Sequence, residues 1–258
     1  MQTSRIAIDG IDIRQAVIGE GAPVLMTHGW GASIETIYPL AAQLSKLGYR
    51  CVMLDLPGFG ESAEPRRAWS VRDYVDCCLA LLDAHDWPCA HYFGHSLGGR
   101  IGLMLVAEHP QRINKMTLSN SAGIRVEPGI GQRLRLGAYR RARSSLQKIG
   151  AKSTAENLRR LYNQRFGSAD FLQASPLMRQ TLAQIVNQDL LEYARRAAKP
   201  TVLIWGDEDE ETPLWMGRML ENAMPDAALI VQPGAGHYAY LDFPERTASI
   251  MDALFRSD

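Results

Sequence analysis

Short apolar runs alternate with amphipathic segments through the first 122 residues. Residues 6–8 and 11–17 are rich in β-branched side chains and flank Asp9-Gly10, which predicts a β-hairpin. Apolar residues at helical spacing follow Ser33 and Ser70 and run from Leu97 to His109. Between them, apolar runs too short for helices predict buried strands at 24–27, 51–54, 91–93 and 116–118. This alternation predicts an α/β fold with a mostly parallel, doubly wound sheet that is covered by helices on both faces.

The alternation stops between residues 123 and 199, where only helical signatures are found. Ser153 and Glu156, for example, have the spacing of a capping box. Strand patterns return from residue 200, at 201–205 and 228–231, and each is followed by a helix that begins near a proline. We therefore expect a core formed by residues 1–122 and 200–258, interrupted by an α-helical insertion at residues 123–199.

The composition is typical of a globular protein that needs no metal or disulfide to fold, because 46% of its 258 residues are hydrophobic and 22% are charged. No apolar stretch approaches the ~18–20 residues of a membrane span. The first residues also lack the pattern of a signal peptide, so we expect a cytoplasmic protein with no membrane span. The four cysteines and six histidines show no metal-ligand spacing, and we expect reduced thiols and no metal site.

The charges balance overall but not locally. With 28 basic and 28 acidic residues the net charge is zero, which argues against a nucleic-acid partner. Residues 123–199, however, hold 15 basic and 5 acidic residues, a net charge of +10, and the rest of the chain carries −10. The arginines of this segment either coat the solvent faces of its helices or attract a carboxylate or phosphate of the substrate, and the sequence leaves both open.

The clearest chemical signal is Gly94-His95-Ser96-Leu97-Gly98, between the strand predicted at 91–93 and the helix that follows. G-x-S-x-G in a strand–turn–helix setting is the nucleophile elbow, whose small residues permit the sharp turn that exposes the serine. No Lys-Ser/Thr pair follows, so a phosphate-binding P-loop is excluded. Ser96 is therefore the predicted nucleophile. The backbone N–H of Leu97, at the positive end of the helix, is predicted to be one donor of an oxyanion hole.

A serine nucleophile needs a base, and the base needs an orienting carboxylate. In an elbow protein the chain order is Ser, then Asp or Glu, then His. After Ser96, His237 is the one histidine outside the helix of the elbow itself, so His237 is the predicted base. The acid lies among five consecutive carboxylates at 207–211, and the pattern alone does not choose among them.

At this point the chain resembles the serine α/β-hydrolase superfamily over nearly its whole length. The matching segments are His28-Gly29-Trp30-Gly31, Asp55-Leu56-Pro57-Gly58-Phe59-Gly60-Glu61-Ser62, the elbow, Trp205-Gly206-x-x-Asp209-x-x-Thr212-Pro213 and Gly234-Ala235-Gly236-His237. The resemblance implies Asp209 as the acid, with Asp207 or another carboxylate of the run as alternatives. It also implies the backbone N–H of Trp30 as the second oxyanion donor, and a cap domain formed by residues 123–199. Trp30 and Tyr238 are expected to contact the substrate.

The resemblance further implies a carboxylesterase that cleaves small to medium esters through an acyl-enzyme on Ser96, with a small-molecule ester as partner and no cofactor. A serine at the elbow disfavours the dehalogenase and epoxide-hydrolase branches, which use an aspartate there. A hydrolase of carbon–carbon bonds in anionic diketo acids remains an alternative, although such enzymes commonly carry Asn where this chain has His95. A ligand-sensing α/β-hydrolase with slow turnover is the other alternative, and the oligomeric state is left open.

Overall fold

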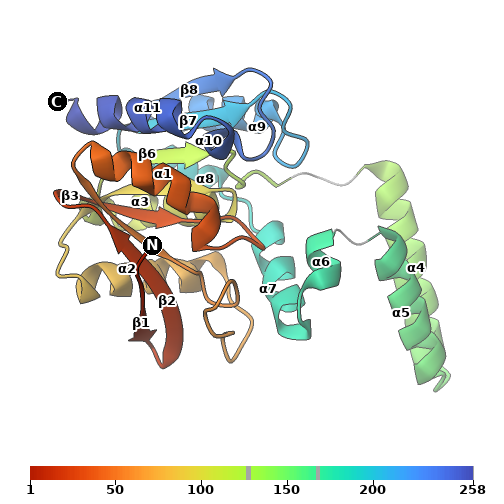
Figure 1. Cartoon of the computed structure of the whole chain (residues 1–258). Coiled ribbons are helices and arrows are strands. Elements are labelled where there is room, and N and C mark those ends of the chain that lie inside the picture. The colour runs from red at the N-terminus through yellow and green to blue at the C-terminus, as the bar shows by residue number, and fades with distance from the viewer. Residues whose placement is uncertain (126–128, 167–168, 258) are drawn as a thin grey trace.

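The computed structural model describes residues 1–125, 129–166 and 169–257. In these residues an eight-stranded sheet has the order β1-β2-β4-β3-β5-β6-β7-β8 (Figure 1). The pairs β1–β2 and β2–β4 are antiparallel and the other pairs are parallel, so the predicted mostly parallel α/β sheet is confirmed. The strands are β1 (Thr3–Ile8), β2 (Ile11–Ile18), β3 (Ala22–Thr27), β4 (Tyr49–Leu54), β5 (Ala90–His95), β6 (Ile113–Ser119), β7 (Thr201–Gly206) and β8 (Ala227–Gln232).

The predicted hairpin is formed by β1 and β2, in which Ile8 pairs with Ile11. Asp9 and Gly10 have φ angles of 50° and 74°. Positive φ at both central residues is what a type I′ turn requires, and the twist of that turn matches the twist of the strands it joins. The local sequence therefore determines the register of this edge of the sheet.

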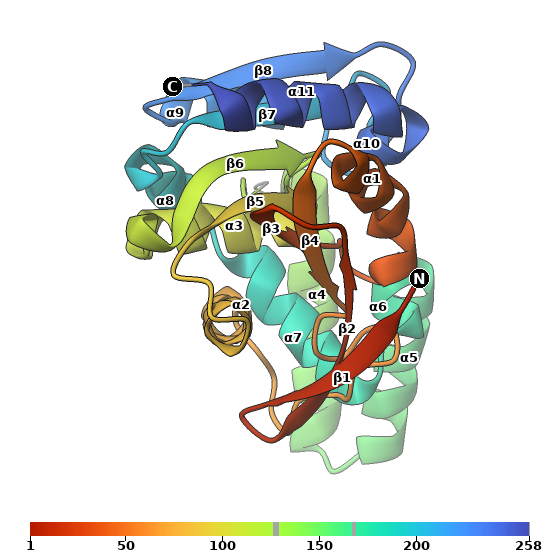
Figure 2. The same ribbon diagram turned by 60° about the vertical axis from the view of Figure 1, so that its left-hand side comes forward.

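Helices cover both faces of the sheet (Figure 2). The inner strands of the parallel part have buried residues on both faces, as β3 illustrates: Val24 and Met26 pack with one helix layer, and Leu25 packs with the other. The layer that includes Val24 consists of α1 (Ile34–Lys46), α10 (Ala239–Asp242) and α11 (Pro244–Arg256). The opposite layer consists of α2 (Val71–Ala84), α3 (Leu97–Glu108), α8 (Leu191–Arg196) and α9 (Leu214–Ala223).

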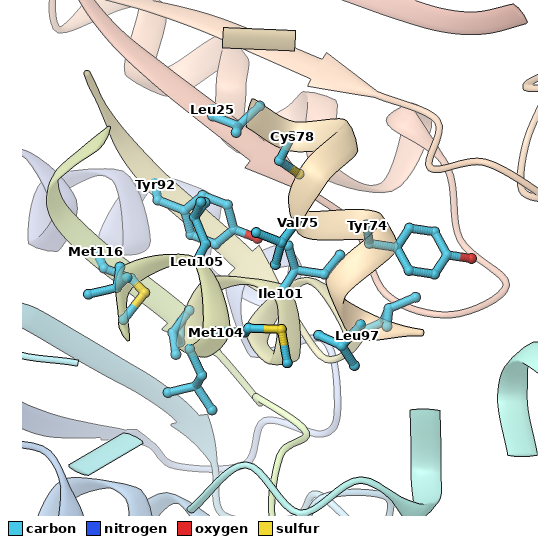
Figure 3. Packing of buried hydrophobic residues seen from close by; sticks show 14 of the residues in the cluster. Leu25, Tyr74, Val75, Cys78, Tyr92, Leu97, Ile101, Met104, Leu105 and Met116 are labelled. Atoms are coloured by element: carbon cyan, nitrogen blue, oxygen red, sulfur yellow. The ribbon is translucent and has the colours of Figure 1, made fainter. Parts of the chain in front are cut away.

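The centre of the larger hydrophobic core lies between α2, α3 and the middle strands (Figure 3). Tyr92 of β5 and Met116 of β6 are buried there against α3, which follows the elbow. The apolar stripe that was predicted after Ser70 points into this core, and Ser70 forms a capping box with Asp73. Because α3 is buried nearly all round, its first turn, and with it Ser96, is held rigidly.

Between β6 and β7 the described chain is helical. Its helices are α4 (Ile130–Lys148), α5 (Lys152–Phe166), α6 (Ala169–Gln173), α7 (Pro176–Asn187) and α8, which belongs to the core layer. α4 and α5 pack side by side, apart from the sheet (Figures 1 and 2), and the rings of Tyr139 and Tyr162 stack between them with centroids 4.0 Å apart. The expected boundary at residue 123 thus falls between β6 and the first of these helices.

The capping box predicted at Ser153 is wrong in register. α5 begins at Lys152, so Ser153 lies inside its first turn, and Glu156 forms an ion pair with Arg159 one turn further on. The short helices α6, α8 and α10 were not predicted, because so few residues carry no readable periodicity. In the described part of the chain, no helix combines the length and the apolar character that crossing a bilayer requires.

Candidate active site

Ser96 lies in a strained turn between β5 and α3. Its φ of 50° and ψ of −103° are rarely adopted by a residue with a side chain. A β-carbon on Gly94 would approach the carbonyl oxygen of Gly98 to 2.4 Å, and one on Gly98 would approach that of Thr27 to 2.5 Å. Both flanking glycines are therefore required by close backbone packing, and the turn leaves the Ser96 side chain at the wall of a cavity.

Two backbone N–H groups lie close to Ser96. Leu97 is the first residue of α3, and Trp30 lies in the loop after β3. Within the described residues, neither N–H donates a hydrogen bond to another protein group. A β-carbon on Gly29 would lie 3.2 Å from Cβ of Ser96, so this loop passes close to the nucleophile. Trp30 and Leu97 line the same cavity as Ser96.

His237 and Asp209 are held together in the loops after β8 and β7. Nδ1 of His237 lies 3.0 Å from Oδ2 and 3.1 Å from Oδ1 of Asp209, whose carboxylate is buried. Burial by itself would raise the pKa of the Asp209 carboxyl. Hydrogen bonds from His237, Thr212 and Asn120 outweigh burial and leave that pKa well below its usual range. Asp209 is therefore ionised, and it fixes the orientation of the His237 ring.

Asn120 and Thr212 complete the shell of this carboxylate, and sequence reasoning gave neither of them a role. Nδ2 of Asn120, just after β6, donates to Asp209 at 2.6 Å, and Oγ1 of Thr212 donates at 2.5 Å. Asp207, the alternative acid, is exposed and accepts a hydrogen bond from the backbone N–H of Gly234 at 2.7 Å. The position of Asn120 at the carboxyl end of a strand was the available signal.

The side chains of His28 and His95 form hydrogen bonds with backbone groups and do not line the described cavity. Nδ1 of His28 donates to the carbonyl of Gly29 at 2.7 Å, and its Nε2 accepts from the N–H of Leu56 at 2.9 Å. Nε2 of His95 donates to the carbonyl of His237 at 2.9 Å. Burial, together with the adjacent His237, lowers the pKa of His95 to about 3, so this ring is neutral at ordinary pH. Both rings thus position the loops that carry the predicted site residues.

A cavity of about 700 Å³ opens beside Ser96 and His237. The structure brings these two side chains to one cavity, but in the described residues no hydrogen bond joins Ser96 Oγ to His237 Nε2. Oε2 of Glu211 lies 3.4 Å from that nitrogen. Tyr238, the other expected substrate contact, is absent from the described cavity wall, and its ring lies 4.7 Å from that of His95.

Sequence reasoning missed two charged residues of this wall, Arg100 and Glu211. Arg100 lies one turn after Ser96 on α3 and is only 6% exposed. Glu211 belongs to the acidic run that sequence reasoning treated mostly as a solvated turn. Its side chain is 67% exposed, yet it lines the cavity beside His237. Neither could be assigned from pattern, since both positions depend on how distant loops meet.

The described residues contain no group of three or more His, Cys, Asp and Glu side chains that could hold a metal ion. Cys51, Cys77 and Cys78 are buried, and burial raises the pKa of the Cys51 and Cys77 thiols to about 12. Such thiols are protonated and absent from the described cavity wall, so they are packing groups.

Comparison with known proteins agrees with this fold. The chain belongs to the α/β-hydrolase family, because the family model described as the alpha/beta hydrolase fold matches residues 22–244. An esterase structure from Exiguobacterium antarcticum superposes with a TM-score of 0.77 at 22% identity, covering 99% of this chain and 100% of that one. The chain is therefore a member of a hydrolase enzyme family.

Three curated relatives are similar over most of the chain. The pimeloyl-[acyl-carrier protein] methyl ester esterase of Chromobacterium violaceum is 30% identical over 87% of this chain and 90% of its own length. The 2-hydroxy-6-oxo-6-(2'-aminophenyl)hexa-2,4-dienoic acid hydrolase of Metapseudomonas resinovorans is 26% identical, over 93% and 86%. The dihydrolipoyllysine-residue acetyltransferase component of the acetoin cleaving system of Pseudomonas putida is 28% identical over 92% of this chain, which spans 64% of that protein.

Proposed function

We propose that this protein is a serine hydrolase that cleaves small to medium carboxylic esters through an acyl-enzyme formed on Ser96. The observation that carries the proposal is the convergence of three groups at one cavity. These are a strained, glycine-flanked serine, a histidine oriented by a buried ionised carboxylate, and two backbone N–H groups that donate to no other group among the described residues. This set matches the requirements of acyl transfer, namely nucleophile, base with orienter, and oxyanion donors.

In the proposed reaction His237 takes the Ser96 proton while Ser96 Oγ attacks the ester carbonyl. The negative charge that develops on the carbonyl oxygen is bound by the N–H groups of Trp30 and Leu97. His237 then gives the proton to the leaving alcohol, and the acyl group remains on Ser96. A water molecule, deprotonated by His237, attacks the acyl-enzyme and releases the carboxylic acid. Asp209 stabilises the imidazolium at both steps without taking its proton.

Proton transfer requires His237 Nε2 to form a hydrogen bond with Ser96 Oγ. In the structure that nitrogen lies 3.4 Å from Oε2 of Glu211. Catalytic hydrogen bonds are often long in free enzymes and shorten when substrate binds. We infer that a small rotation of the His237 side chain on binding moves Nε2 from Glu211 to Ser96. This step keeps the Nδ1 hydrogen bond to Asp209, because that carboxylate offers two oxygens at 3.0 and 3.1 Å.

The helical segment at residues 123–199 acts as a cap over this site in our proposal. α4 and α7 contribute residues to the wall of the cavity, and so does α3, which follows the elbow. Substrate choice would then depend on the cap helices, and the hydrolytic step on the core. Truncating Leu136 of α4 to Ala should change the order of preference among acyl chain lengths more than the rate on the shortest ester.

A second candidate is hydrolysis of carbon–carbon bonds in an anionic diketo acid. Two observations favour it: the relative from Metapseudomonas resinovorans, whose name describes a dienoic acid hydrolase, and the arginines of the cavity wall. The residue before the nucleophile weighs against it, because His95 donates to a backbone carbonyl and does not line the described cavity.

The test is steady-state hydrolysis of a p-nitrophenyl ester series by wild type, Ser96→Ala and His237→Ala, together with a vinylogous diketo acid. An esterase turns over the short and medium esters, and each substitution reduces kcat by at least about a thousandfold. Turnover of the diketo acid with negligible ester hydrolysis would transfer the assignment to the second candidate. Equal ester hydrolysis by wild type and Ser96→Ala would reject both.

A further inference from the structure

Four arginine side chains line the cavity beside Ser96, namely Arg100, Arg125, Arg133 and Arg140. Among the described residues of this wall, the one carboxylate is that of Glu211. The rest of the wall is largely apolar, with contributions from α4, α7 and α9. A pocket for neutral esters needs no such set of guanidinium groups, since only the carbonyl and the leaving group require polar contacts.

α4 presents these arginines in a regular way. Its cavity-lining residues are Arg133, Leu136, Gly137 and Arg140, which recur at the three- and four-residue spacing of one helix face. This face is therefore turned toward the cavity. Arg141, the next residue, lies off this stripe and does not line the cavity in the described structure. Some of the arginines that give residues 123–199 their positive charge therefore line the cavity beside Ser96, and not only the outer surface of the segment.

Arg100 adds a buried charge to the cavity wall. It follows Ser96 by one helical turn, a rise of about 6 Å, and is 6% exposed. Nη1 donates to the carbonyl oxygens of Ile185 and Gln188 at 3.0 and 2.8 Å, and in the described chain no carboxylate forms an ion pair with it. Burial lowers the pKa of Arg100 to about 10, against the opposing effect of the nearby Asp189 carboxylate, so Arg100 stays charged at ordinary pH. Burying a cation is costly, and an anionic ligand nearby would offset more of that cost.

The position of Glu211 indicates whether the acyl part or the alcohol part of the ester carries the anionic group. In ester hydrolysis the leaving alcohol takes its proton from Nε2 of His237, so it must lie beside that nitrogen. The carboxylate of Glu211 is 3.4 Å from Nε2. A negatively charged alcohol would meet this carboxylate and be repelled. The anion therefore belongs to the acyl part, which extends away from Glu211.

We propose that the cavity selects esters whose acyl chain ends in an anionic group and whose alcohol is small and uncharged, with Arg140 of α4 and Arg100 of α3 forming the anion subsite. The inference rests on the proposed function and names its substrate class. A monoalkyl ester of a linear dicarboxylic acid has this chemistry, and so does a methyl ester whose acyl chain ends in a phosphate. Hydrolysis consumes one water and releases the neutral alcohol, leaving the acid with its second anionic group intact.

The experiment compares three methyl esters of equal acyl length: methyl octanoate, monomethyl suberate and methyl 8-phosphonooxyoctanoate. Alcohol release is followed for wild type, Arg140→Gln and the matched control Arg141→Gln, at about 20 mM and about 0.5 M NaCl. Wild type is expected to prefer at least one anionic ester by about tenfold or more in kcat/KM, the usual effect of a charged hydrogen bond. The preference should shrink at high salt, because salt screens the attraction. The more favoured anion identifies carboxylate or phosphate as the natural group.

Arg140→Gln is expected to cut this preference ratio at least threefold, and Arg141→Gln to leave it unchanged. Because both variants remove one exposed arginine from the same helix, a general loss of long-range attraction would affect them equally. The inference would be overturned if wild type hydrolysed the three esters with equal kcat/KM and the same salt dependence. It would also be overturned if the two substitutions had equal effects. If the proposed function itself were wrong, wild type would hydrolyse none of the three esters.

Discussion

Replacing Asp209 with Asn tests how the site orients its base. Among the described residues, five groups donate hydrogen bonds to the Asp209 carboxylate. Backbone N–H groups of Glu211 and Thr212 donate to Oδ1 at 2.8 and 3.0 Å. Asn120, the Thr212 hydroxyl and His237 Nδ1 reach Oδ2 at 2.6, 2.5 and 3.0 Å. An Asn side chain that keeps its oxygen on the two N–H groups must place its NH₂ where Oδ2 was, facing the other three.

That NH₂ group makes His237 Nδ1 an acceptor, so the ring proton moves to Nε2. With a proton already on Nε2, His237 cannot take one from Ser96. In the serine-protease triad the wrong tautomer and the lost charge together lower kcat by a factor of about 10⁴. We expect a similar loss of kcat here, which corresponds to about 5 kcal/mol of activation free energy, because each tenfold change in rate is about 1.36 kcal/mol. The fold should survive, because the isosteric amide keeps both backbone hydrogen bonds.

The assay is kcat for a p-nitrophenyl ester, with circular dichroism and thermal unfolding to confirm that the variant folds. Asp207→Asn is the matched control. Asp207 lies in the same acidic run, is exposed and accepts from the N–H of Gly234, so kcat should change by less than about threefold. If Asp209→Asn retains more than a tenth of wild-type activity, or Asp207→Asn loses as much, the assignment of the orienting carboxylate is refuted.

Three further substitutions probe the scaffold around the site. Burial, with Lys115 nearby, lowers the pKa of His91 to about 4, and the ring stacks on that of Phe255 with Nδ1 unpartnered. Between pH 6.5 and 4, His91 binds a proton in the unfolded chain but not in the folded chain, so the free energy of unfolding falls as the pH drops. His91→Phe removes this effect and should therefore stabilise the protein by about 2 kcal/mol more at pH 5 than at pH 8. Equal shifts in thermal unfolding at the two pH values would contradict this. Gly98→Ala places a β-carbon 2.5 Å from a carbonyl oxygen at the end of β3. It should lower the free energy of unfolding, measured in urea, by about 1–3 kcal/mol and reduce activity. An unchanged free energy of unfolding and activity would show that the turn has room for the methyl group. Asn120→Ala removes the 2.6 Å hydrogen bond to the orienting carboxylate and should lower kcat about tenfold with little change in KM, whereas a change in KM alone would assign it to binding.

Most of the core could be predicted because its signals are local. The β1–β2 hairpin follows from Asp9-Gly10, the buried strands from apolar runs, and the elbow from the glycines around Ser96, each within a few neighbouring residues. The helical segment between β6 and β7 was predicted in kind. Its helix ends were less accurate, as Ser153 shows, because amphipathic helices that pack mainly on each other carry weaker boundary signals.

The site could be predicted only in part, since its remaining residues are brought together by tertiary structure. Asp209 could not be told from its acidic neighbours by pattern, and only the resemblance to a family singled it out. Asn120 and Arg100 carry no motif, and their roles come from loops and helices far away in the chain. Glu211 looked like one charge in a solvated turn, yet the loop turns it toward His237. Such roles depend on which loops meet at the carboxyl edge of the sheet.

The central claim is that Ser96 is the nucleophile of a hydrolase, and covalent labelling tests it most directly. Intact-mass analysis after incubation with a fluorophosphonate should show one adduct per chain, formed as Ser96 Oγ displaces fluoride. Peptide mapping should place the adduct on Ser96, and Ser96→Ala should show none. Labelling that persists in Ser96→Ala, or a folded wild type that stays unlabelled, would contradict the account.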